Sequence, residues 1–73
     1  MKLNPGVLSS VRVDDASSTV TYIGEAPVAS SEGSATWRIK KLETTGSVLK
    51  ITWADGNNNF DNIWTDRASL SYS

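Results

Sequence analysis

The sequence contains no cysteine and no histidine among its 73 residues. It therefore has no thiol for a disulfide or for nucleophilic catalysis, and no imidazole for general-base chemistry or zinc ligation. A chain this short buries only about 60% of the surface that its unfolded form exposes, so its own core is marginal. With disulfides excluded, a metal or neighbouring subunits are the remaining sources of added stability.

An excess of charge of one sign and a long apolar run are also missing. Seven Lys and Arg residues balance eight Asp and Glu residues, which leaves a net charge of -1 and no broad positive field to attract nucleic acid or acidic lipid. No apolar run approaches the roughly 20 residues that span a bilayer, and the first residues lack the apolar stretch of a secretory signal. We expect neither a nucleic-acid partner nor a membrane partner.

The residues that are abundant favour β structure. Ser and Thr make up about a quarter of the chain, and the helix formers Leu, Ala and Glu are scattered among Val, Ile and Thr. Several segments alternate apolar and polar residues in steps of two, and none sustains a helical stripe. We predict an all-β fold: a small antiparallel meander or barrel of about five strands with one short helical turn.

The first predicted hairpin joins strands at residues 7–13 and 19–25 through the turn-forming residues 14–18. In the second strand, Gly24 indicates a bulge or a close approach of another backbone. Few large apolar residues follow, so residues 24–35 are predicted to be a connection or an arm, as are residues 1–6. The whole chain, residues 1–73, is predicted to form a single β domain.

The second predicted hairpin is the strongest in the sequence. Trp37 and Ile39 alternate with polar residues, as do Leu49, Ile51 and Trp53, and Gly46 supplies the positive φ of the turn. A turn-rich stretch, a helical turn at residues 60–64 and a last strand at residues 68–72 follow. The predicted core consists of Trp37, Ile39, Leu49, Ile51, Trp53, Phe60, Leu70 and Tyr72.

The Asp/Asn-rich stretch after Trp53 allows two interpretations. Its oxygen-bearing side chains alternate as in a calcium loop, and the candidate ligands are Asp55, Asn57, Asn59, Asp61 and Asp66. A calcium loop needs glycine where Phe60 stands, and its last ligand is a longer, bidentate acid. The sequence therefore favours a hydrogen-bonded Asx-rich turn without a metal.

A sugar-stacking platform is a second candidate site. Trp64 has no assigned strand partner, and Asp55, Asn57 and Asn59 supply groups that could bond sugar hydroxyls. Trp37 and Trp53 are predicted to lie in the core instead, because they are in phase with Ile39 and Ile51.

The charged residues offer no catalytic pair. Asp14-Asp15 and Asp61 with Asp66 lie among turn residues, with no apolar wall to raise a pKa. Arg38, Lys40 and Lys41 are predicted to form a solvated stripe or subunit salt bridges. Asp66-Arg67 is predicted to pair with Asp61 or to brace the turn against the last strand. We expect no enzymatic activity and no cofactor.

Five segments combine aromatic residues with Asp-Gly and Asp-Arg-Ala steps: Thr21–Ala26, Trp37–Leu42, Trp53–Gly56, Phe60–Trp64 and Asp66–Ser69. These segments resemble a group of short, uncharacterised proteins encoded by tailed bacteriophages. The resemblance implies a phage protein and no particular reaction, because the group has no established catalytic or binding residues. Members carry more Asp in the turn where this chain has Asn, and an acidic residue at the position of Thr65.

Three functions agree with these observations. The first is a virion structural protein that self-assembles on the capsid or tail, as a homo-oligomer and with other virion proteins, through β-edge and arm contacts. The second is a small carbohydrate-binding module of a phage tail that recognises a host-surface glycan. The third is an intracellular accessory protein that inhibits a host factor through the acidic stretch at residues 14–32.

Overall fold

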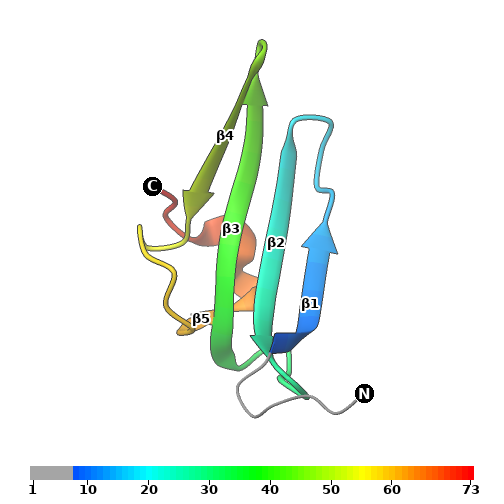
Figure 1. Cartoon of the computed structure of the whole chain (residues 1–73), viewed down its shortest axis with the longest axis vertical. Coiled ribbons are helices and arrows are strands. Elements are labelled where there is room, and N and C mark those ends of the chain that lie inside the picture. Colours follow the sequence, from blue (N-terminus) through cyan, green and yellow to red (C-terminus); the bar gives the residue numbers. More distant parts are fainter. Residues whose placement is uncertain (1–7) are drawn as a thin grey trace.

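The computed structural model describes residues 8–73, which form an antiparallel sheet with one short 3-10 helix (Figure 1). Its elements are β1 (Leu8–Asp14), β2 (Val20–Pro27), β3 (Ala35–Thr45), β4 (Val48–Trp53), β5 (Asn62–Ile63) and η1 (Trp64–Ser69). The first four strands form a meander in the order β1-β2-β3-β4. The predicted all-β meander with one helical turn is confirmed, and the sheet is open rather than closed into a barrel.

The long strand β3 organises the sheet because its two edges are paired differently. One edge pairs with β2, while the other pairs with β4 along residues 40–45 and with β5 along residues 35–37. The chain between β4 and β5 therefore loops out from the side of the sheet. Among the described residues, no helix is long and apolar enough to cross a membrane.

The first hairpin forms as predicted, with shifted ends. Ser17 organises its turn, because the Ser17 Oγ accepts hydrogen bonds from the amides of Thr19 and Val20. The predicted connection at residues 24–35 begins later than expected, since β2 continues to Pro27. Val7 and the predicted arm at residues 1–6 lie outside the described residues.

The β3–β4 hairpin turns through only two residues, Gly46 and Ser47, and Gly46 has a φ of 61°. The register places Leu42 opposite Ile51 and Lys40 opposite Trp53. Residues that pair directly share a face of the sheet. Leu49, Ile51 and Trp53 therefore lie on the face opposite to Trp37 and Ile39.

This register corrects part of the predicted core. Trp37 and Ile39 are buried as predicted, and Leu70 and Tyr72 pack, partly buried, against the core. Leu49, Ile51 and Phe60 are exposed by 55%, 53% and 40%, so their assignment to the core was wrong. Trp53 is only half-buried, on the other face. The buried core consists of Ala26, Trp37, Ile39, Ala54 and Trp64.

The end of the chain also differs from the prediction. Residues 60–64 do not form a helical turn, because Asn62–Ile63 pair with β3 and the helix begins at Trp64. The predicted strand at residues 68–72 is reduced to a single bridge between Ala54 and Tyr72. The cause is tertiary: η1 turns the Trp64 side chain back onto the sheet, where it joins the core.

Candidate interaction surface

The two faces of the sheet have different surroundings. In Figure 1, η1 lies behind β2 and β3, and the C-terminal residues follow it on that side. We call this side the covered face. The opposite side, the open face, has no element packed over it among the described residues. Its large apolar residues are Val11, Val13, Ile23, Leu42, Leu49 and Ile51.

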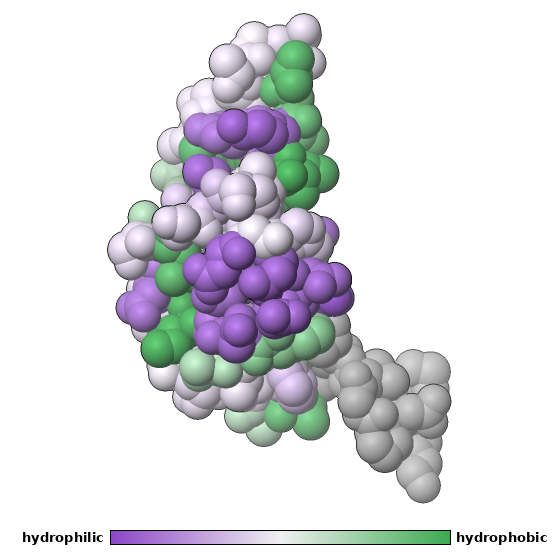
Figure 2. All heavy atoms as spheres, turned by 90° about the vertical axis from the view of Figure 1, so that its left-hand side faces the viewer, coloured by the Kyte–Doolittle hydropathy of each residue, from purple (hydrophilic) through white to green (hydrophobic). Residues whose placement is uncertain are grey.

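Strand register brings these six residues together. Val13 pairs with Ile23 across β1 and β2, and Leu42 pairs with Ile51 across β3 and β4. Val13 is 65% exposed and Val11 52%, so the face is accessible at the β1 side as well as at β4. Figure 2, a view from the β4 side, shows apolar side chains along one side of its upper half. Across β2 and β3, Ile23 pairs with Lys40 and Thr21 with Leu42, so the open face carries two neighbouring apolar clusters rather than a scatter of single residues.

One end of the open face carries charges and aromatic rings. The Arg38 guanidinium lies 4.7 Å from the centre of the Phe60 ring and 5.7 Å from that of Trp53, and Lys40 Nζ lies 5.5 Å from the Trp53 ring. Arg38 also pairs with Glu25, with 3.4 Å between Nε and the nearer carboxylate oxygen. Nη2 of Arg38 donates to the other carboxylate oxygen of Glu25 at 3.4 Å, whereas the buried Nε has no hydrogen-bond acceptor among the described residues. We call these five residues the cationic end.

The covered face is held by two tryptophans that meet over a glycine. The rings of Trp37 and Trp64 are 5.8 Å apart at their centres, with a tilt of 38°. A Cβ atom on Gly24 would lie 2.5 Å from a carbon of the Trp64 ring and 3.1 Å from one of Trp37. The prediction for Gly24, a bulge or a close approach of another backbone, was wrong: β2 is regular there, and the group that approaches Gly24 is the side chain of Trp64.

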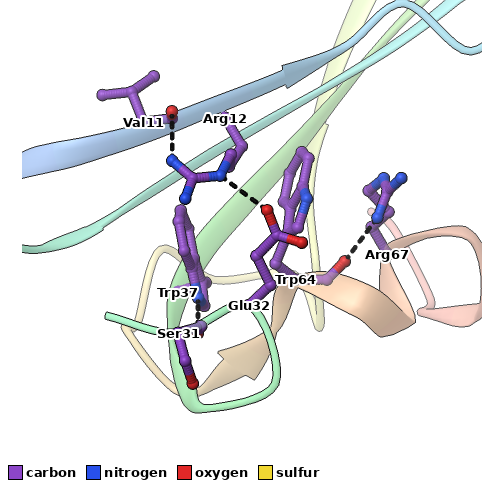
Figure 3. A network of polar contacts seen from close by, with 7 residues as sticks. All are labelled: Val11, Arg12, Ser31, Glu32, Trp37, Trp64 and Arg67. Carbon is purple, nitrogen blue, oxygen red and sulfur yellow. Dashed lines mark hydrogen bonds and ion pairs between the residues drawn. The ribbon is translucent and has the colours of Figure 1, made fainter. Parts of the chain in front are cut away.

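The connection at residues 28–34 is fixed to this core, as Figure 3 shows. Trp37 donates its indole N–H to the carbonyl of Ser31 at 2.8 Å, and Arg12 Nε donates to the carboxylate of Glu32 at 2.8 Å. The guanidinium of Arg12 lies 5.5 Å from the Trp37 ring. These contacts pack the segment, which was predicted to be a connection or an arm, against its own chain.

Arg67 connects η1 to the sheet, but its acidic partner is Asp14 of β1 rather than the predicted Asp61. Its Nε donates to Asp14 at 2.9 Å and its Nη1 to the carbonyl of Trp64 at 3.1 Å. Its own carbonyl accepts a 2.7 Å hydrogen bond from the hydroxyl of Tyr72. Burial, with a smaller contribution from the neighbouring Tyr22, raises the pKa of Tyr72 to about 12.

The Asp/Asn-rich stretch forms the favoured hydrogen-bonded turn. Asp55 and Gly56 adopt positive φ angles, and the amide of Asn59 donates to the side-chain oxygen of Asn57 at 2.9 Å. Of the calcium candidates, Asp61 directly precedes β5 and Asp66 lies in η1. No group of three acidic side chains that could hold a metal occurs within residues 8–73.

The structure separates the members of the predicted sugar platform. Trp64 is only 4% exposed and is covered by the guanidinium of Arg67, so its ring cannot stack on a sugar. Asp55, Asn57 and Asn59 remain exposed. The aromatic rings that accompany this loop on the open side are those of Trp53 and Phe60. The sequence-based prediction missed the open face. A two-residue turn at residues 46–47 would have revealed it, because that turn sets the β3–β4 register and places Leu49 and Ile51 opposite to Trp37 and Ile39.

The chain matched no protein-family model, no curated protein and no solved structure. The open face is the side of a sheet, and it contains no pocket among residues 8–73.

Proposed function

We propose that this protein is a structural component of a bacteriophage particle that self-assembles on the capsid or tail. The observation that carries the proposal is the open face, where six large apolar side chains gather and nothing in the described chain covers them. The phage resemblance of the sequence supplies the expectation of a virion location.

The binding partner that we propose for the open face is the same face of a second copy of the chain. Sheets stack face to face at about 10 Å, with their inner side chains interdigitated. Four strands about 4.8 Å apart, each contributing about seven residues, give a face of roughly 450 Å². Burying this face against the same face of a second copy removes further apolar surface from water, which adds to the five-residue core of the described chain. The resulting contact lies toward the small end of specific interfaces, which suits repeated use in an assembly.

The oligomeric state of the isolated protein tests this proposal. We expect light scattering after size-exclusion chromatography to show a mass that rises with concentration. Val13→Lys should shift the association to concentrations at least about tenfold higher, because the lysine would be desolvated in the contact. Val28→Lys is the matched control, since Val28 is 69% exposed but lies in the connection after β2. A strictly monomeric wild-type protein, or equal effects of both lysines, would contradict the proposal.

The virion location needs a separate measurement. Mass spectrometry of purified phage particles should detect the protein at a copy number that is a multiple of its oligomeric state. Presence in the host lysate and absence from particles would instead favour the accessory-protein alternative.

The cationic end favours carbohydrate binding as a second candidate function. Trp53 and Phe60 offer partly exposed rings beside the cation of Arg38, and the exposed Asn57–Asn59 loop precedes Phe60. Rings with nearby amides suit a sugar, and Arg38 suits a sugar acid. An acidic glycan should quench tryptophan fluorescence in the wild type and not in Trp53→Ala. Silence across neutral and acidic glycans would remove this candidate.

A further inference from the structure

The outer edge of β4 carries main-chain groups that no strand pairs with in residues 8–73. Ala54 donates its amide inward to the carbonyl of Ile39, whereas Trp53 exchanges hydrogen bonds outward with Ser73. Main-chain groups alternate in direction along a strand. The amides and carbonyls of Leu49 and Ile51 therefore point outward, to the free side of β4.

A short ladder already begins on this edge. Trp53 and Ser73 exchange two hydrogen bonds of 3.2 and 3.1 Å, and the amide of Asp55 donates to the carbonyl of Ser71 at 2.7 Å. The bridge between Ala54 and Tyr72 is antiparallel. This end of the edge is occupied, so residues 48–52 are left to accept an antiparallel strand.

The opposite edge of the sheet, on β1, is better protected. The register of β1 is irregular between Leu8 and Ser10, and Arg12 donates a side-chain hydrogen bond to the carbonyl of Val11. Irregular register and charged side chains hinder edge pairing. β1 also exposes apolar side chains, at Val11 and Val13, but the register of β4 is regular, and its exposed apolar residues Val48, Leu49 and Ile51 are accompanied by one charge, Lys50. A regular, exposed edge of this kind is a template for another strand.

We propose that β4 pairs with β4 of a second copy, antiparallel and about a twofold axis at Lys50. This register places Leu49 of each copy opposite Ile51 of the other, so all the outward groups of both residues are bonded. It also joins the two sheets edge to edge, with both open faces on the same side. A register shifted by one residue would place the open faces on opposite sides.

The charges near the axis permit this arrangement. The two Lys50 residues face each other, and like charges directly opposite are unfavourable. Each Lys50, however, lies 3.9 Å from Glu43 of its own chain and is 64% exposed, so its charge is compensated and hydrated. The pairing rests on the self-association proposed above, but it uses main-chain groups rather than the open face.

A single introduced cysteine tests the register, because the chain has none of its own. In the proposed pair the two Lys50 Cα atoms are about 4.5 Å apart, as in a non-hydrogen-bonded antiparallel pair, which a disulfide can span. Val48→Cys is the matched control: it is equally exposed at 62% on the same strand, but its two copies would be about 14 Å apart. Under a mild oxidant, Lys50→Cys should form covalent dimers at least about tenfold faster than Val48→Cys.

Amide hydrogen exchange on the unmodified chain provides a test that needs no variant. The amides of Leu49 and Ile51 should gain protection at least about tenfold as the protein concentration rises. The same change should persist in Val13→Lys, whose open face is blocked. Equal cross-linking of the two cysteine variants, or unprotected amides in an associated protein, would overturn the β4 pairing and leave association through the open face standing. Monomers at all concentrations would overturn both proposals.

Discussion

Gly24 is the residue on which the packing of the covered face depends. Its missing side chain creates the space that the Trp64 ring fills, next to Trp37. The glycine is required here for close approach, because its φ lies outside the positive range. Two large rings can then lie on a small sheet without a gap.

Gly24→Ala should destabilise the fold by about 1–3 kcal/mol, because the new Cβ would overlap the Trp64 ring and force it outward. Chemical denaturation monitored by tryptophan fluorescence measures the change. Gly33→Ala is the matched control: no atom lies within 4 Å of its added Cβ, so an effect below about 1 kcal/mol is expected. Similar losses of stability in both variants would show that the fold does not require the space that Gly24 leaves for the Trp64 ring.

Tyr72 makes the stability of the folded protein depend on pH in the alkaline range. The folded state raises its pKa to about 12, mainly through burial, so the native protein holds the phenol proton more tightly than the unfolded chain, whose value is about 10. The stabilisation that comes from this tighter hold on the proton is fully present below about pH 10 and is lost as the pH rises toward 12. Denaturation midpoints measured across this range should fall with pH.

The Tyr72→Phe variant is the control for this titration. It should lose about 0.5–1.5 kcal/mol at neutral pH, because the hydrogen bond to the carbonyl of Arg67 is removed. Its stability should also fall less steeply than that of the wild type above pH 10. Parallel pH profiles would assign the alkaline loss to other groups.

At the scale of elements, η1 is attached to the rest of the structure by the buried Trp64, by the main-chain hydrogen bond from Thr65 to Glu32 and by one ion pair. η1 is only six residues long and has no side-chain cap, so its position rests on tertiary contacts. Arg67 bonds Asp14 of β1, and it also lies over the Trp64 ring at 4.5 Å. One guanidinium thus connects the first strand, the helix and the core.

Asp14→Asn should therefore cost about 1 kcal/mol and should increase proteolysis near η1. Asp66→Asn removes the same charge from an exposed position in η1 itself and should change stability by less than about 0.5 kcal/mol. Thermal melts and limited proteolysis of both variants test this difference. Equal stabilities would show that the stacking of Arg67, rather than its ion pair, holds η1.

At the scale of the whole molecule, the chain has two unequal sides and one free strand edge. The covered face concentrates the core, while the open face and the β4 edge carry exposed apolar side chains. A contact through one surface alone gives a closed pair of copies. Two different twofold contacts on the same protomer would extend an assembly beyond a dimer, which is the property that a particle component requires.

The sequence by itself determined the class of fold and the position of the hairpins. Alternating residues, turn-forming clusters and Gly46 predicted strands and turns at nearly the observed places, because these signals act over a few residues. The burial of Trp37 and Ile39 followed from the same local patterns, whereas the partner of Arg67, Asp14, lies 53 residues away in the chain and was not predicted. The Asx-rich turn was equally local, since the side chain of Asn57 bonds the backbone two residues further on.

Only the tertiary structure decided which apolar residues are buried. Leu49 and Ile51 have the alternation of core residues, but a two-residue turn places them on the face opposite to Trp37 and Ile39. Because side chains alternate with a period of two, the register decides between the two faces for a whole strand at once. Trp64 reached the core for a similar reason: its place depends on the space above Gly24, which lies 40 residues away in the chain.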